Sequence, residues 1–289
     1  MRVSVRRRAE RLSGFNAEAK TDGSHVFSFA DMEVASHLAH RRQFRLCRVF
    51  NEDTVQPGGG FDMHGHAEYE IFSIVLSGSL VHEDSLGERS IVRAGGVQHT
   101  SAGTGMRHSE KNASDDEGCL LLQVWLEPRV PGVAPAYALR HFAWLDEGSA
   151  PRTLLLSPSG GGDGGALRLN AECYVWGCRV RRDDVELASP WPRAAGFLVA
   201  FTTLAAEASD VLDLSADGAA SEPLRSGDCA FVESATKVVL RSGSRHALSV
   251  VVLAFGEAQW KELSIQDKWA SFCACQGVSQ RRLAASIGS

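Results

Sequence analysis

The segment Gly58-Gly59-Gly60-Phe61-Asp62-Met63-His64-Gly65-His66, followed about forty residues later by His108-Ser109-Glu110, organises this chain. In an extended strand, alternate side chains point to the same face. His64 and His66 therefore share one face of a strand, and His108 and Glu110 share one face of another. Two such strands can aim three imidazoles and one carboxylate at a single point. The spacing predicts a metal site.

The residues between the two pairs indicate short strands joined by tight turns. The run from Glu70 to Leu76 is β-branched and mostly apolar, and it ends at the turn signal Ser77-Gly78. A second strand is expected from Ser79 to His82, and the turn residues Asp84-Ser85-Leu86-Gly87 follow it. This pattern predicts a barrel built from hairpins, with the metal in its mouth.

Three imidazoles and one carboxylate suit a borderline divalent metal such as Fe, Mn, Ni, Cu or Zn, and they exclude a soft all-thiolate site. Four protein ligands leave positions open for water, dioxygen or a substrate. The sequence leaves the roles of two further residues open. His99 lies in the stretch where a turn leads into a strand, three residues after Gly96, and it could replace or supplement His108. Glu70 could be a ligand, but we expected it to support a ligand imidazole through a hydrogen bond.

The same residues resemble the signature of the pirin family of the cupin superfamily. The resemblance rests on Phe61-Asp62-Met63-His64-Gly65-His66, Glu70, Val75-Leu76-Ser77-Gly78, His82-Glu83-Asp84-Ser85-Leu86-Gly87, Ser101 to Glu110, and Leu122-Gln123-Val124-Trp125-Leu126. It implies an all-β bicupin fold, with two consecutive cupin-type barrels. It also implies a mononuclear metal at His64, His66, His108 and Glu110, most often Fe(II), with Mn, Ni, Cu, Co or Zn as alternatives.

The resemblance also implies candidate functions. Some pirins have quercetin dioxygenase activity, which predicts a small-molecule substrate, dioxygen as co-substrate, and Glu110, if loosely held, as the base that accepts a substrate proton. Other members are discussed as transcriptional co-regulators, so a metal- and redox-dependent regulatory protein with a protein partner is the alternative. A non-redox enzyme that uses Zn or Mn is a third possibility. The resemblance favours a monomer.

Two residues depart from the family pattern. Gly65 stands where proline is usual between the first two histidines, and Ala67 stands where a basic residue is usual. Glycine loosens the backbone between two ligands. The missing positive charge changes what is attracted to the pocket, so substrate identity is left open.

Composition sets the broad class. The chain has 289 residues, of which 44% are hydrophobic and 22% are charged, and these fractions are typical of a globular protein. A net charge of −5 does not favour direct nucleic-acid binding. We expect no membrane span and no secretory signal. The seven cysteines are odd in number and scattered, as is typical of reduced thiols in the cytoplasm.

The second half repeats the pattern of short strands but contains one histidine, His246. We therefore expect residues 1–145 to form a metal-binding cupin domain and residues 146–289 to form a degenerate cupin domain without metal. The glycine-rich segment 157–165 is interpreted as a flexible connection. Apolar residues between Gln259 and Ala274 have an imperfect helical spacing, which predicts a short C-terminal helix or arm.

Overall fold

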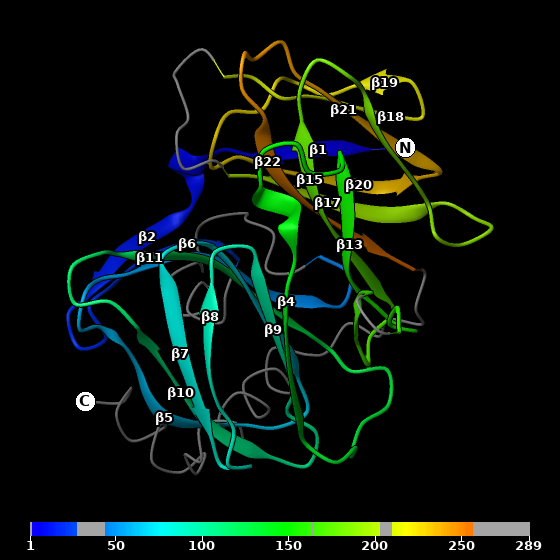
Figure 1. Cartoon of the computed structure of the whole chain (residues 1–289). Coiled ribbons are helices and arrows are strands. Elements are labelled where there is room, and N and C mark those ends of the chain that lie inside the picture. The colour runs from blue at the N-terminus through cyan, green and yellow to red at the C-terminus, as the bar shows by residue number, and fades with distance from the viewer. Residues whose placement is uncertain (1, 28–43, 163–164, 203–209, 257–289) are drawn as a thin grey trace, which may run out of the picture.

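A computed structural model of the chain describes residues 2–27, 44–162, 165–202 and 210–256 (Figure 1). The described residues are almost entirely β-structure, with two short 3₁₀ helices at Arg8–Glu10 and Ala143–Leu145. The all-β prediction is therefore confirmed for this part of the chain. The predicted C-terminal helix or arm between Gln259 and Ala274 lies outside the described residues. No helix in the described ranges has the length and apolar character needed to cross a membrane.

The first half of the chain forms two sheets. The first large sheet has the order β12 (Ala136–His141), β9 (Gly96–Ser101), β6 (Glu70–Ser77), β11 (Cys119–Leu126), β4 (Cys47–Val55), β3 (Thr21–Phe27) and β2 (Leu12–Asn16). The first small sheet has the order β5 (Gly60–His66), β10 (Met106–Asn112), β7 (Ser79–Asp84) and β8 (Arg89–Arg93). The strands predicted around the two ligand pairs are all present.

The second half repeats this arrangement. The second large sheet has the order β1 (Val3–Arg6), β20 (Cys229–Ala235), β17 (Ala195–Phe201), β22 (Leu248–Phe255), β15 (Cys173–Val180), β13 (Arg152–Ser157) and β14 (Leu167–Arg168). The second small sheet has the order β16 (Val185–Ala188), β21 (Lys237–Arg241), β18 (Asp213–Ala216) and β19 (Ala219–Ala220). Two consecutive β units are thus confirmed, and in the described residues each is a pair of facing sheets.

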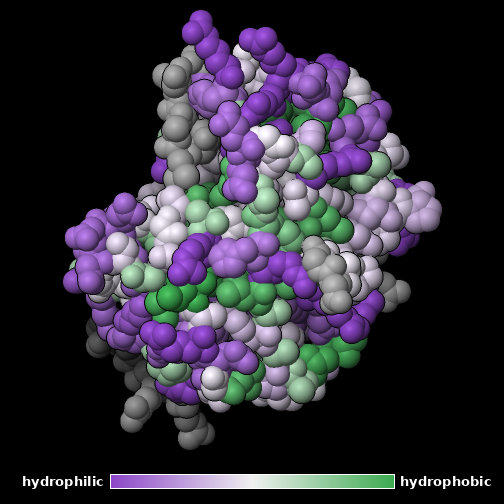
Figure 2. Space-filling model, viewed as in Figure 1, coloured by the Kyte–Doolittle hydropathy of each residue, from purple (hydrophilic) through white to green (hydrophobic). Residues whose placement is uncertain are grey.

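The four sheets stack in the order small, large, large, small. The largest apolar cluster lies between the two large sheets and joins Phe72 and Leu122 of the first to Leu198 and Leu253 of the second. A smaller cluster lies between the sheets of the first half, and a third, made only of apolar side chains, lies between those of the second. Figure 2 shows hydrophobic residues mainly where the two halves meet, interrupted by hydrophilic ones.

Strand alternation explains this layering. In β6, Phe72 and Ile74 face the second large sheet, whereas Ser73 and Val75 face the interior of the first half. Because side chains of a strand alternate between faces, one strand supplies both the contact between the halves and the lining of the interior. The interior of the first half therefore receives its polar residues from fixed positions.

The N-terminal segment joins the halves. β1 pairs with β20 of the second half, and β2 pairs with β3 of the first (Figure 1). Between them, Arg11 contacts the buried Glu52 of β4, with 3.2 Å between Nη1 and Oε2. The hydroxyl of Thr202, in the second half, donates to the same carboxylate at 2.7 Å. Burial would raise the pKa of Glu52, but Arg11, Thr202 and Arg8 together lower it below its usual value.

Replacing Glu52 tests this connection. Glu52→Ala leaves the Arg11 guanidinium, whose side chain is 1% exposed, buried without its partner. We expect a loss of about 3 kcal/mol or more in the free energy of unfolding, measured by urea denaturation. Glu222→Ala is the matched control, because Glu222 pairs with Arg7 but is 78% exposed, and it should cost less than about 1 kcal/mol. Equal losses would show that Glu52 does not anchor the halves.

Candidate metal centre

Three imidazoles meet inside the first half. His64 and His66 come from β5, and His108 comes from the adjacent strand β10, where it pairs directly with His64. The ring centroids are 4.6 Å apart for His64 and His66, 4.7 Å for His64 and His108, and 4.8 Å for His66 and His108. A β-bulge between His108 and Glu110 shifts the register beside this cluster. The three predicted histidines are therefore brought together.

The ring nitrogens of this cluster suit a metal ion. Both nitrogens of His66 and both nitrogens of His108 are buried and have no hydrogen-bond partner among the described residues. Buried polar atoms without partners cost free energy, and a metal ion would satisfy one nitrogen on each ring. The carbonyl oxygen of Asp62 lies 2.6 Å from His64 Nδ1 and can only accept, so Nδ1 carries the proton. His64 Nε2 is then free to bind a metal.

The electrostatic environment keeps the rings of His66 and His108 neutral. Burial and the neighbouring His108 and His64 together lower the pKa of His66 to about 2. Burial and the nearby His64 and His82 lower the pKa of His108 to about 3. An imidazole binds a metal only in its neutral form. The donor set therefore fits a divalent transition metal.

Glu110 lies in a second group of potential ligands. Its carboxylate is grouped with His82 and His108, and the three offer ligand atoms within 4.8 Å of one another. His108 belongs to both groups. The four predicted ligands are thus divided into a cluster of three imidazoles and the Glu110 carboxylate. Glu110 lies next to this cluster, because His108 belongs to both ligand groups.

The Glu110 carboxylate is held by three donors. Ser73 Oγ of β6 donates to Oε1 at 3.4 Å, and Gln98 Nε2 of β9 donates to the same oxygen. Gln123 Nε2 of β11 donates to Oε2 at 2.8 Å. The base role predicted for Glu110 was conditional on a loosely held carboxylate, and this carboxylate is held firmly. Three strands of the large sheet fix this side chain.

Aromatic side chains orient the two glutamines. Tyr137 donates its hydroxyl to Gln98 Oε1 at 3.1 Å, and Trp125 donates its indole N–H to Gln123 Oε1 at 3.2 Å. Each bond engages the amide oxygen, so each NH₂ group points to Glu110. The sequence pattern did not reveal this network, although Gln123 interrupts β11, which is otherwise apolar.

His82 adjoins the site, but we did not name it as a candidate site residue from the sequence. Its ring lies 5.3 Å from that of His108 and stacks on Tyr137 at 4.1 Å. It pairs with Glu110 across β7 and β10. His82 Nε2 contacts Asp84 at 3.1 Å. The alternation of His82 and Asp84 along β7 was the signal that could have placed both in the interior.

Two other expectations need correction. We expected Glu70 to support a ligand imidazole and considered His99 as a substitute for His108. Glu70 Oε2 instead lies 2.7 Å from His99 Nε2 and accepts a bond from the backbone N–H of Asn170, in the second half, at 3.1 Å. Glu70 lies two residues before Phe72, so it faces the second half. His99 and Glu70 therefore connect the halves and lie outside both ligand groups.

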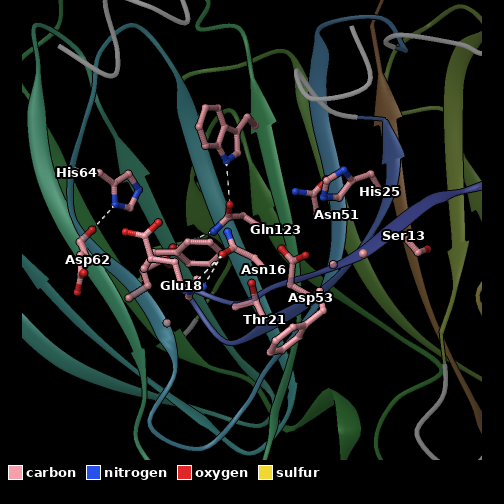
Figure 3. A pocket seen from close by; sticks show the side chains of 18 of the residues that line it. Ser13, Asn16, Glu18, Thr21, His25, Asn51, Asp53, Asp62, His64 and Gln123 are labelled. Carbon is pink, nitrogen blue, oxygen red and sulfur yellow. Dashed lines mark hydrogen bonds between the residues drawn. The ribbon is translucent and has the colours of Figure 1, made fainter. Parts of the chain in front are cut away.

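A cavity of about 640 Å³ leads to the cluster. Its lining includes His64, His66 and Glu110, alternate residues of β3, β4 and β11, and the hairpin from β2 to β3. In Figure 3, His64 and Asp62 lie on one side, His25, Asn51 and Asp53 lie on the other, and Gln123 lies between them. The volume is within the range of small-molecule sites.

Asp53 is an unusual member of this lining. Its side chain points into the first half from β4, and the residue is 4% exposed. Burial raises the pKa of Asp53, His25 lowers it, and the charges of Glu110 and Glu52 raise it, so that the pKa is about 7. A buried acid with a raised pKa in a cavity is typical of a functional site.

Comparison with known sequences identifies related proteins. The family model described as Pirin matches residues 5–126. A quercetin 2,3-dioxygenase of Escherichia coli K12 is 37% identical over 155 residues, which are 54% of this chain and 64% of that protein. A pirin-like protein of Caulobacter vibrioides is 30% identical over 175 residues, which are 61% of this chain and 72% of that protein. The chain thus spans just under two thirds of the length of the Escherichia coli relative.

A solved structure has the same architecture. The structure of the bacterial pirin YhhW from Escherichia coli in complex with nickel(II) aligns with a TM-score of 0.72 and 25% identity. The alignment covers 89% of this chain and all of that one. The likeness therefore includes both halves, and the predicted bicupin fold is confirmed.

The raised pKa of Asp53 predicts a pH-dependent stability. Because the folded-state pKa is about 7 and the ordinary value is 3.8, ionisation costs the folded state more than the unfolded state, and stability is lost as pH rises toward 7. Asp53→Asn removes this cost. We expect the metal-free variant to be more stable than the unsubstituted protein at pH 8, by up to about 4 kcal/mol, and nearly equal at about pH 4.

Urea denaturation at the two pH values measures this difference. Asp22→Asn, at an exposed position of the neighbouring strand β3, is the control and should show no such dependence. An Asp53→Asn variant that is no more stable at pH 8 would mean that the carboxylate is solvated or paired.

Proposed function

This chain belongs to the pirin family, and we propose that it is a mononuclear metal protein that catalyses the dioxygen-dependent ring cleavage of a quercetin-like flavonol or a related enolisable aromatic compound. The observation that carries this proposal is the set of buried imidazole nitrogens without partners that adjoins a cavity of substrate size. The name of the Escherichia coli relative supports the reaction class.

We assign the metal to His64, His66 and His108, with Glu110 as the fourth ligand. Fe(II) is the metal we favour, and Mn, Ni, Cu, Co and Zn suit the same donors. The nickel(II) complex of a related pirin supports the binding of a divalent metal by a protein of this fold. When bound, the metal supplies a Lewis-acidic position for an enolate oxygen and for dioxygen.

The residues of the chain have separate tasks in this proposal. The Asp62 carbonyl fixes the His64 ring, and the edge-on contact of Trp125 with His66, at 4.7 Å between centroids, fixes a second ring. Glu110 accepts the proton of the substrate hydroxyl. Because Ser73, Gln98 and Gln123 hold its carboxylate, it must receive that proton without a large movement.

The chain would divide into two domains. Residues 1–145 would form the metal-binding domain, and residues 146–289 would form the domain without metal. β1 belongs to the first range but pairs with β20 of the second half. All members of the two ligand groups lie between His64 and Glu110. The five cysteines in the described residues are free and buried, which supports a cytoplasmic location.

Metal content tests the ligand assignment. We expect protein purified without oxygen and loaded with Fe(II) to hold about one metal per chain, because the ring nitrogens of His66 and His108 have no hydrogen-bond partner among the described residues. His66→Ala and His108→Ala should lose it. His99→Gln is the control and should retain the metal, since His99 binds Glu70 instead. Retention by His108→Ala, or loss by His99→Gln, would overturn the assignment.

Oxygen uptake tests the reaction. Fe(II)-loaded protein should consume dioxygen when quercetin is added, and His66→Ala should not. Glu110→Gln should lower kcat by at least about 100-fold if Glu110 is the base. Metal content must be measured in the same sample, so that loss of the base is separated from loss of the metal. Uptake that is undiminished in Glu110→Gln with metal bound would exclude the base role, and metal without uptake would exclude the dioxygenase.

A further inference from the structure

The cavity has a polar wall that is separate from the imidazole cluster. Asn51 and Asp53 of β4 and His25 of β3 line it, and β3 and β4 are adjacent strands in which His25 pairs with Asn51 and Gly23 pairs with Asp53. These odd-numbered residues share the inner face of the sheet, whereas Glu52 between them faces the second half. In Figure 3 this wall lies across the cavity from His64.

Two acceptor groups of this wall have no donor. The Asp53 carboxylate takes part in no hydrogen bond or ion pair within the described part of the chain, and its oxygens are not fully buried but face the cavity. Asn51 Oδ1 is buried and without a hydrogen-bond partner among those residues. Buried oxygen atoms normally accept hydrogen bonds. A ligand with hydrogen-bond donors could pair with both the Asp53 carboxylate and Asn51 Oδ1.

Gly23 makes room for this wall. A Cβ atom at position 23 would lie 3.1 Å from Asp53 Oδ1 and 3.1 Å from His25 Nε2. Its φ angle is not in the left-handed region, so the backbone does not require glycine there. The absence of a side chain allows the carboxylate and the imidazole to approach each other in the cavity.

The rest of the cavity suits a flat aromatic ligand. Phe15, Phe61, Met63 and Trp125 line it together with the polar wall. Phe15 is 59% exposed and Met63 is 43% exposed, and they are two of the four large hydrophobic residues that are exposed in the described part. Exposed apolar side chains beside a cavity are typical of a binding site for an apolar surface.

We propose that Asp53 and Asn51 form a hydroxyl-binding subsite. One hydroxyl group of an aromatic substrate approaches the imidazoles, and the subsite selects substrates that carry further hydroxyl groups at the opposite end. The ligand class is a polyhydroxylated planar aromatic compound. Its ring lies between the apolar residues, and its remote hydroxyl groups donate to the Asp53 carboxylate and to Asn51 Oδ1. This inference rests on the proposed function, because it names the substrate class of the same cavity, and Asp53 acts in specificity.

Binding of two flavonols tests the subsite. Quercetin carries hydroxyl groups on both outer rings, whereas 3-hydroxyflavone keeps the hydroxyl next to the carbonyl and has no others. Their affinities are measured without oxygen by calorimetry, using the full chain both metal-free and loaded with Zn(II). We expect the unsubstituted protein to bind quercetin at least about 10-fold more tightly than 3-hydroxyflavone.

Asp53→Leu keeps the branching at Cγ and removes the acceptor. It should lower the affinity for quercetin by about 10-fold and leave that for 3-hydroxyflavone unchanged. Asp53→Asn keeps an acceptor and should retain part of the preference. If Asp53→Leu preserves the ratio of the two affinities, or lowers both equally, the subsite is wrong.

This experiment is independent of turnover. Selective loss in Asp53→Leu together with no oxygen uptake by the Fe(II)-loaded protein would establish the subsite and exclude the dioxygenase. Oxygen uptake with quercetin and an unchanged affinity ratio in Asp53→Leu would establish the reaction and exclude the subsite.

Discussion

The two-residue alternation of β-strands is the constraint on which this structure depends. In β4, β6 and β11, one set of side chains packs between the two large sheets, and the other set lines the interior of the first half. A strand shifted by one residue would exchange these sets. It would place Phe72 where Ser73 contacts Glu110 and would remove the site and the contact between the halves together. The same strand register therefore determines both the packing of the halves and the geometry of the site.

The two halves use the same architecture for different purposes. The interior of the second half is an apolar cluster that includes Phe197, Val199 and Leu240. The interior of the first half holds buried histidines, glutamines and acids, whose desolvation costs free energy. The second half packs its large sheet against that of the first. The half with the apolar interior thus adjoins the half that bears the polar site.

Sequence alone predicted the strands of the first half, the gathering of three histidines and the repetition of β units, because these depend on alternation and turn residues within short segments. It did not predict the partners of Glu70, His82 or Asp53. Alternation says which residues of one strand share a face, but not which face of the sheet that is. His82 and Asp53 face the interior and Glu70 faces the second half, and this difference follows from the sheet order, which is a property of the whole fold.

The central claim is that one metal ion lies among three imidazoles in the interior of the first half. A crystal structure of the Fe(II)-loaded protein, with diffraction recorded on both sides of the iron absorption edge, tests it most directly. The account predicts one anomalous peak per chain, within about 2.3 Å of a ring nitrogen of each of His64, His66 and His108. A crystal with iron shown by fluorescence but a peak elsewhere, or with three imidazoles around ordered water, would contradict it.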